Sequence, residues 1–146
     1  MKNKLEATTI SRNRELLKIL EEQKYIKLTY LFGSVANGNE GKLSDVDIAV
    51  LLDDSLSKKE RFDLQLKLIG DLSAILKTNK LDLIIINDAP LSLRYEIIKA
   101  NYPLFVRNEG EKIDFEQKIL SAYLDRRYYE KRAADEFLKK VAEMGL

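Results

Sequence analysis

Two carboxylates lie close together in the chain at a spacing that suits metal-assisted phosphoryl chemistry. Asp45 and Asp47 are separated by one residue at the start of an apolar run. On a strand, residues two apart project from the same face, so the two carboxylates can share one cation. Without a divalent ion they would repel and raise each other's proton affinity. Hard oxygen ligands favour Mg²⁺ or Mn²⁺ over softer metals.

Gly33 and Ser34 precede this pair by ten intervening residues, directly after a second apolar run. A glycine after a strand allows a positive φ and lets a phosphate approach the backbone closely. Exposed N–H groups and the Ser34 hydroxyl can then contact phosphate oxygens. The two residues therefore predict a triphosphate-binding turn that faces the metal site.

Asp82, in a third apolar run, could complete a two-metal centre if its strand neighbours the first carboxylates. Two metal ions about 3.5–4 Å apart clamp the attacking and leaving oxygens of an in-line displacement. Asp82 would hold the first metal or accept the nucleophile's proton. Each feature has an ordinary alternative: a Gly-Ser turn is usually only a turn, an Asp-x-Asp pair is usually solvated, and a lone strand aspartate can face solvent. Their joint spacing favours the catalytic interpretation.

The elements that must position these residues can be read from hydrophobic periodicity and turn residues. Alternating or short apolar runs predict strands, and helical spacing with capping signals predicts helices. Ser57 followed by Glu60 forms a capping box that starts one helix. The predicted strands are 26–32, 45–52, 81–86 and 102–106. The predicted helices are about 5–22, 57–76, 91–100 and a region from 112 onward. The apolar residues of the helix 57–76 are Phe62, Leu66, Ile69, Leu72 and Leu76.

Composition narrows the class of protein. With 146 residues and 45% hydrophobic content, the chain predicts one domain over 1–146 that includes a C-terminal helical region, 112–146. The absence of cysteine and histidine excludes thiol nucleophiles, imidazole bases and the usual zinc sites. Basic and acidic residues number 25 and 24, so no stable nucleic-acid binding is expected. Neither secretion nor membrane spanning is supported, and we expect a cytoplasmic protein.

The Gly-Ser-x10-Asp-x-Asp pattern with a later strand aspartate resembles the DNA polymerase β superfamily of nucleotidyltransferases. More specifically, Leu31-Phe32-Gly33-Ser34 and Ser44-Asp45-Val46-Asp47-Ile48 are similar to the minimal nucleotidyltransferases, the MNT antitoxins paired with HEPN toxins. The segment from Leu81 to Pro90, followed by Leu93-Arg94-Tyr95, also resembles them. The chain departs from many relatives at Asn37, where they carry arginine, and Lys42 is a candidate substitute.

This resemblance implies an α/β (α+β) fold with a mixed β-sheet flanked by helices. It also implies Mg²⁺ (or Mn²⁺), ATP as the donor, and transfer of AMP to a hydroxyl of a HEPN toxin. We expect that hydroxyl to belong to a tyrosine. In the C-terminal region, Tyr123, Tyr128 and Tyr129 lie among arginines and lysines, a combination enriched where proteins bind proteins.

Two other functions remain open from the sequence. One is transfer to a small molecule, as in aminoglycoside-modifying enzymes of the superfamily, but these generally use an additional domain to form the acceptor pocket. The other is a binding module that masks a toxin without catalysis. Three acidic residues that converge on one site, Asp45, Asp47 and Asp82, argue against a purely passive role.

Overall fold

Four strands form one mixed sheet in a computed structural model that describes residues 6–36 and 46–145. The strands are β1 (Ile26–Phe32), β2 (Val46–Leu52), β3 (Leu81–Ile85) and β4 (Pro103–Val106). Their spatial order is β3-β2-β1-β4. β1 is antiparallel to β2 and β4, and β2 is parallel to β3. The predicted mixed α/β architecture is confirmed.

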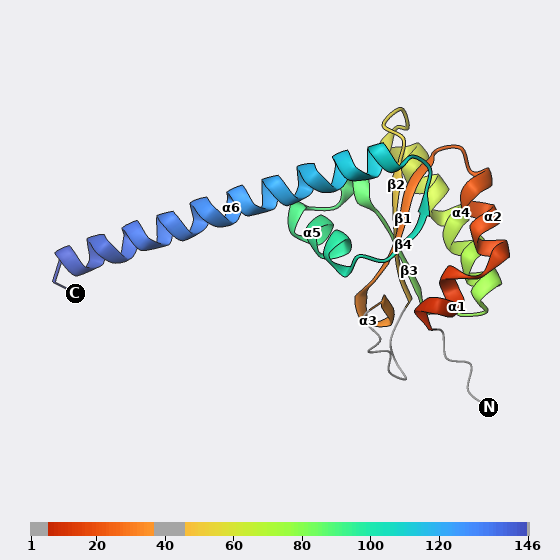
Figure 1. Cartoon of the computed structure of the whole chain (residues 1–146), viewed down its shortest axis with the longest axis horizontal. Helices are drawn as coiled ribbons and strands as arrows, with labels where there is room; N and C mark the ends of the chain where they lie inside the picture. The colour runs from red at the N-terminus through yellow and green to blue at the C-terminus, as the bar shows by residue number, and fades with distance from the viewer. Residues whose placement is uncertain (1–5, 37–45, 146) are drawn as a thin grey trace.

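One face of the sheet is covered by α1 (Ala7–Ser11), α2 (Arg14–Glu22) and α4 (Lys58–Leu76) (Figure 1). Each strand contributes alternate side chains to this core, because successive residues of a strand face opposite sides of the sheet. α4 connects the parallel strands β2 and β3, and it begins at the predicted capping box of Ser57 and Glu60. From β2, the residues in this core are Val46, Ile48, Val50 and Leu52.

The opposite face is covered by the 3₁₀ turn η1 (Ile86–Asp88), α5 (Leu91–Ala100) and the first turns of α6 (Glu109–Glu143). Tyr30, Phe32 and Ala49 on the strands pack there against Ile97 of α5. Phe115 of α6 closes the same cluster. Asp47 belongs to this face, because it alternates with Val46 and Ile48 along β2.

α6 contains 35 residues and is therefore about 50 Å long. It leaves the domain and projects well beyond it (Figure 1). Its base is fixed by a hydrogen bond of 2.6 Å from the Tyr30 hydroxyl to Glu116 and by an ion pair of 3.1 Å between Lys27 and Glu111. Farther along, Tyr123 stacks on Tyr95 of α5, with the ring centroids 3.7 Å apart.

Two details of the expected elements are wrong. The helix predicted over about 5–22 is divided into α1 and α2, because the Asn13 side chain accepts a hydrogen bond from the Leu16 N–H and caps a new helix. In α4 the buried stripe consists of leucines at 64, 68, 72 and 76, whereas Phe62 and Leu66 are more than half exposed. The stripe that meets the sheet thus includes Leu64 and excludes Phe62 and Leu66 on either side of it.

No helix in the described ranges, 6–36 and 46–145, is long and apolar enough to cross a membrane.

Candidate active site

Strand register brings the predicted residues of β2 and β3 together where these two parallel strands begin. This end of the two strands is called the sheet edge. Asp47 pairs with Asp82 across the parallel strands and with Phe32 across the antiparallel ones. Neighbouring strands lie about 4.8 Å apart, so side chains in register on one face are direct neighbours. Asp47 is half-buried and Asp82 is exposed. The role suggested for Asp82 required its strand to neighbour that of Asp47, and this condition is met.

Gly33 follows Phe32 and places the Gly33-Ser34 turn beside Asp47. Its φ is +76°, a conformation that glycine adopts without the steric cost borne by other residues. A Cβ atom at this position would overlap the Asp47 carboxylate, with the Asp47 Cγ at 3.1 Å. The glycine therefore satisfies both the backbone turn and the close approach of the carboxylate.

Ser34 lies in the short helix α3 (Gly33–Ala36), which contacts β1, β2 and α5. The turn is held by Val35, which is buried in the core on the α4 side of the sheet. Ser34 itself is half-buried. The sequence predicted a loop, or a loop with one helical turn, and the described part contains that turn.

Asp45, Asn37 and Lys42 lie outside the described residues. In the described ranges, no group of three or more acidic side chains is arranged to hold a metal ion. Two carboxylates on adjacent strands, beside a turn without a side chain, nevertheless offer the hard oxygen donors that Mg²⁺ or Mn²⁺ takes. The donor chemistry at the sheet edge fits such an ion.

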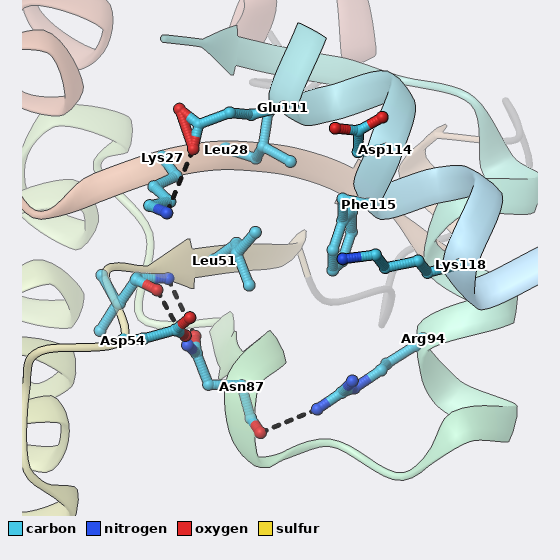
Figure 2. A pocket seen from close by; sticks show the side chains of 11 residues that line it. Lys27, Leu28, Leu51, Asp54, Asn87, Arg94, Glu111, Asp114, Phe115 and Lys118 are labelled. Carbon is cyan, nitrogen blue, oxygen red and sulfur yellow. Dashed lines mark hydrogen bonds and ion pairs between the residues drawn. The ribbon is translucent and has the colours of Figure 1, made fainter. Parts of the chain in front are cut away.

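The motif after β3 has a structural explanation. The Asn87 side chain donates to the Leu52 carbonyl at 2.8 Å and accepts from the Leu52 N–H at 2.9 Å, so it continues the hydrogen bonding of β2. The Arg94 guanidinium donates to the carbonyls of Asn87 and Ala89, at 2.9 and 3.0 Å. Figure 2 shows Asn87 between β2 and Arg94. These side chains support the strand that carries Asp47.

Arg61 of α4 also stabilises the turn η1 that follows β3. It forms an ion pair of 2.7 Å with Asp88, and the guanidinium lowers the pKa of the Asp88 carboxyl. Asp53 accepts a hydrogen bond of 2.9 Å from the Ser55 N–H in a turn. These contacts give Asp53 and Asp88 a structural part in the turns that contain them.

A cavity of about 380 Å³ lies on the same sheet face, but at the other end of β2. Leu51, Asn87 and Arg94 line it, together with Glu111 and Lys118 of α6 (Figure 2). Asp47 and Leu51 are four residues apart on β2, about 13 Å along an extended strand. The cavity therefore does not coincide with the carboxylates. The candidate site lies where Asp47 pairs with Asp82 and contacts Gly33.

Sequence reasoning missed how α6 is attached to the site-bearing sheet. Glu116 accepts from Tyr30 on β1, and burial together with this hydrogen bond raises the pKa of the Tyr30 hydroxyl far above that of free tyrosine. Tyr123, expected at a protein-binding surface, is half-buried in the stack with Tyr95. No local pattern signals these contacts, since their partners are distant in the sequence.

Known proteins are similar to this chain in sequence and in fold. The model of the family described as polymerase beta, nucleotidyltransferase matches residues 14–110. The chain is 31% identical over 123 residues to the protein adenylyltransferase MntA of Aphanizomenon flos-aquae, covering 77% of this chain and 79% of the relative. It is 29% identical over 110 residues to the protein adenylyltransferase MntA of Shewanella oneidensis, covering 75% of each.

Solved structures extend the likeness to three dimensions. A chain from the crystal structure of a toxin–antitoxin with AMP-PNP matches with a TM-score of 0.63 and 25% identity, over 87% of this chain and 98% of that one. A chain from a tri-AMPylated Shewanella oneidensis HEPN toxin in complex with an MNT antitoxin shares the fold, with a TM-score of 0.59 and 23% identity over 90% and 98%. This chain belongs to the polymerase beta nucleotidyltransferase family.

Proposed function

We propose that this protein transfers AMP from ATP to a tyrosine hydroxyl of a HEPN toxin and thereby acts as its antitoxin. The observation that carries the proposal is the direct pairing of Asp47 with Asp82 beside the Gly33 turn. This juxtaposition combines acidic oxygen ligands with a backbone that a phosphate can approach, which are the two requirements of nucleotidyl transfer.

Each residue has a distinct part in the proposed reaction. The Gly33 backbone and the Ser34 hydroxyl bind the triphosphate and orient it. Asp45, Asp47 and Asp82 would hold Mg²⁺ (or Mn²⁺), which supplies charge neutralisation at the phosphates when bound. The acceptor oxygen forms a bond to the α-phosphorus as the bond to pyrophosphate breaks. In the alternative role, Asp82 does not bind the metal and instead accepts the proton of the acceptor hydroxyl.

Relatives support the nature of the acceptor. Both curated relatives carry the name protein adenylyltransferase, and a matched structure holds a toxin–antitoxin with AMP-PNP. Within the described residues, the cavity in Figure 2 lies at the other end of β2, and neither Asp47 nor Asp82 lines it, so that cavity is not an acceptor pocket for the two carboxylates. A docked protein could instead bring its own hydroxyl to within about 3–3.5 Å of the α-phosphate.

The test is to incubate the purified protein with ATP, Mg²⁺ and the HEPN protein encoded beside it, and then to measure the partner's intact mass. One or more added AMP masses, located on tyrosine by peptide mapping and absent after chelation, would support the proposal. An unmodified partner together with adenylylated aminoglycosides would favour the small-molecule alternative. An unmodified partner that is still inhibited by stable binding would favour masking without catalysis.

A further inference from the structure

The distal half of α6 repeats the apolar spacing of its proximal half, one side of which packs on the domain through Ile119 and Tyr123. Ile119 is 4% exposed and faces the domain. Phe137 follows Ile119 by eighteen residues, which is about five helical turns and returns to the same side of the helix. By the same spacing, Leu138 repeats Leu120 and Val141 repeats Tyr123, so an apolar face continues along the helix.

This distal face has no cover within the described chain. Phe137 is 65% exposed, Leu138 is 64% exposed and Met144, on the same side, is 64% exposed. The opposite side of this stretch is mainly charged, with Arg132, Asp135 and Lys139. An apolar stripe with a charged reverse is the pattern of a helix that packs against another element.

Local interactions do little to hold this stretch helical. Its ion pairs, Arg126 with Glu130 at 3.5 Å and Arg132 with Glu136 at 3.7 Å, are exposed. Such pairs contribute little, especially with the basic residue on the N-terminal side. Most helical stability in proteins comes from packing of an amphipathic face. The distal stretch therefore calls for a packing partner.

We propose that this face, formed by Ala134, Phe137, Leu138, Val141 and Met144, is the docking surface for a helix of the HEPN toxin. The inference rests on the proposed function for the identity of the partner. On the proximal half, the corresponding face packs against the helix α5, so a helix is the element that the continued face fits. The toxin helix continues along the distal half of α6 the helix packing that α5 makes with the proximal half.

The geometry also connects docking to the reaction. The apolar face points to the side of α6 on which α5 lies, and α5 contacts both α6 and α3, the helix that contains Ser34. Figure 1 shows α5 beside the proximal part of α6. A partner seated beside α5 is thus on the side of the sheet that α5 covers, which is the face of Asp47 and its paired residue Asp82. The docking surface recruits the acceptor and takes no part in the chemical step.

Phe137→Asp tests this surface, and Tyr128→Asp is its matched control. Both residues are exposed aromatic side chains of α6, at 65% and 58%. Tyr128 belongs to the tyrosines that the sequence suggested for protein binding, but it follows Ile119 by nine residues, about two and a half turns. It therefore lies on the opposite side of α6 from the proposed surface, and its substitution also tests that earlier expectation. Binding of the neighbouring HEPN protein is measured by calorimetry, and circular dichroism verifies that each variant remains folded.

We expect Phe137→Asp to weaken binding about 30-fold or more, as for a central interface residue, and Tyr128→Asp to bind as the unmodified chain does. Equal binding by Phe137→Asp and the unmodified chain, or a larger loss for Tyr128→Asp, would overturn the inference. So would a homodimer of the chain alone that Phe137→Asp converts to a monomer, because the occupant would then be a second copy.

The readouts separate this inference from the proposed function. If the unmodified chain binds the HEPN protein but transfers no AMP to it, the proposed function fails, and the comparison of Phe137→Asp with Tyr128→Asp still decides the docking surface. If AMP is transferred and Phe137→Asp binds normally, the function stands and the docking surface is wrong.

Discussion

The carboxylate edge of the sheet and the distal half of α6 are stabilised in different ways. At the sheet edge, Asp47 is fixed by pairing with strands on both sides and by close contact with the Gly33 backbone. In distal α6, large apolar side chains such as Phe137 are mostly exposed. The first region is completed within the chain. The second requires a surface from another molecule.

The sheet edge needs precise geometry, whereas distal α6 needs only a surface that fits a partner. Metal-assisted phosphoryl transfer needs groups held to fractions of an ångström, which strand register and a glycine turn can provide. Partner recognition needs an exposed apolar surface that a target can cover. Substitutions at the sheet edge should therefore affect the chemical step, whereas those in distal α6 should affect recruitment.

The largest effect is expected from Asp47→Asn, Asp82→Asn and Asp45→Asn. Each removes a metal-ligand charge, so we expect transfer from labelled ATP to fall by about a thousand-fold or more. The fold should persist, because the substitution keeps the shape of the side chain, and thermal melting checks this. Asp63→Asn, at an exposed position of α4, is the control. Full activity in the Asp47 variant would refute the metal-site assignment.

Gly33→Ala should affect both stability and activity at the sheet edge. A positive φ costs a residue with a Cβ about 1–2 kcal/mol, and the added methyl would also displace the Asp47 carboxylate. Gly70→Ala is the control, because nothing lies within 4 Å of its Cβ and it is inside α4. We expect Gly70→Ala to be neutral or stabilising in urea unfolding. Similar unfolding curves for both variants would contradict this explanation of Gly33.

Ser34→Ala should have a smaller effect that is confined to the nucleotide. It removes one phosphate contact among several, so we expect the KM for ATP to rise about 10-fold with little change in the melting temperature. Steady-state kinetics at fixed partner concentration measure the change, with exposed Ser121→Ala of α6 as control. Unchanged kinetics would reduce the Gly33-Ser34 segment to a structural turn.

Tyr30→Phe tests the connection between the two regions. It removes the hydrogen bond to Glu116, so we expect a loss of about 1 kcal/mol in the free energy of unfolding at neutral pH. The pKa of Tyr30 is raised in the folded protein, mainly by burial. Its contribution is therefore present below the pKa of an unfolded tyrosine, about 10, and is lost as the pH rises above that value.

Urea unfolding at neutral pH and at about pH 11 measures this dependence. The unmodified protein should lose more stability than Tyr30→Phe between the two conditions, whereas Tyr129→Phe, which alters an exposed tyrosine, should follow the unmodified protein. An identical alkaline loss in Tyr30→Phe and the unmodified protein would show that the hydroxyl is not held as described.

The strands and the closeness of Gly33 to Asp47 were predictable because their signals are local. The alternation of β2 and the spacing of Gly33 from Asp47 are visible in the sequence, and strand pairing then brings Asp82 into register. The split between α1 and α2 depends on whether Asn13 caps a helix or lies within one, a choice that tertiary packing decides. The Tyr30–Glu116 bond joins residues 86 positions apart and leaves no local pattern.

The central claim is that the sheet edge performs the transfer while distal α6 recruits the acceptor. Rates of AMP transfer to the HEPN protein, measured over a range of partner concentrations, test it most directly with Asp47→Asn and Phe137→Asp. We predict that Asp47→Asn lowers kcat at every concentration, and that Phe137→Asp raises the KM for the partner while kcat recovers at saturation. A lowered kcat with unchanged KM in Phe137→Asp, or recovery of Asp47→Asn at high partner concentration, would contradict the account.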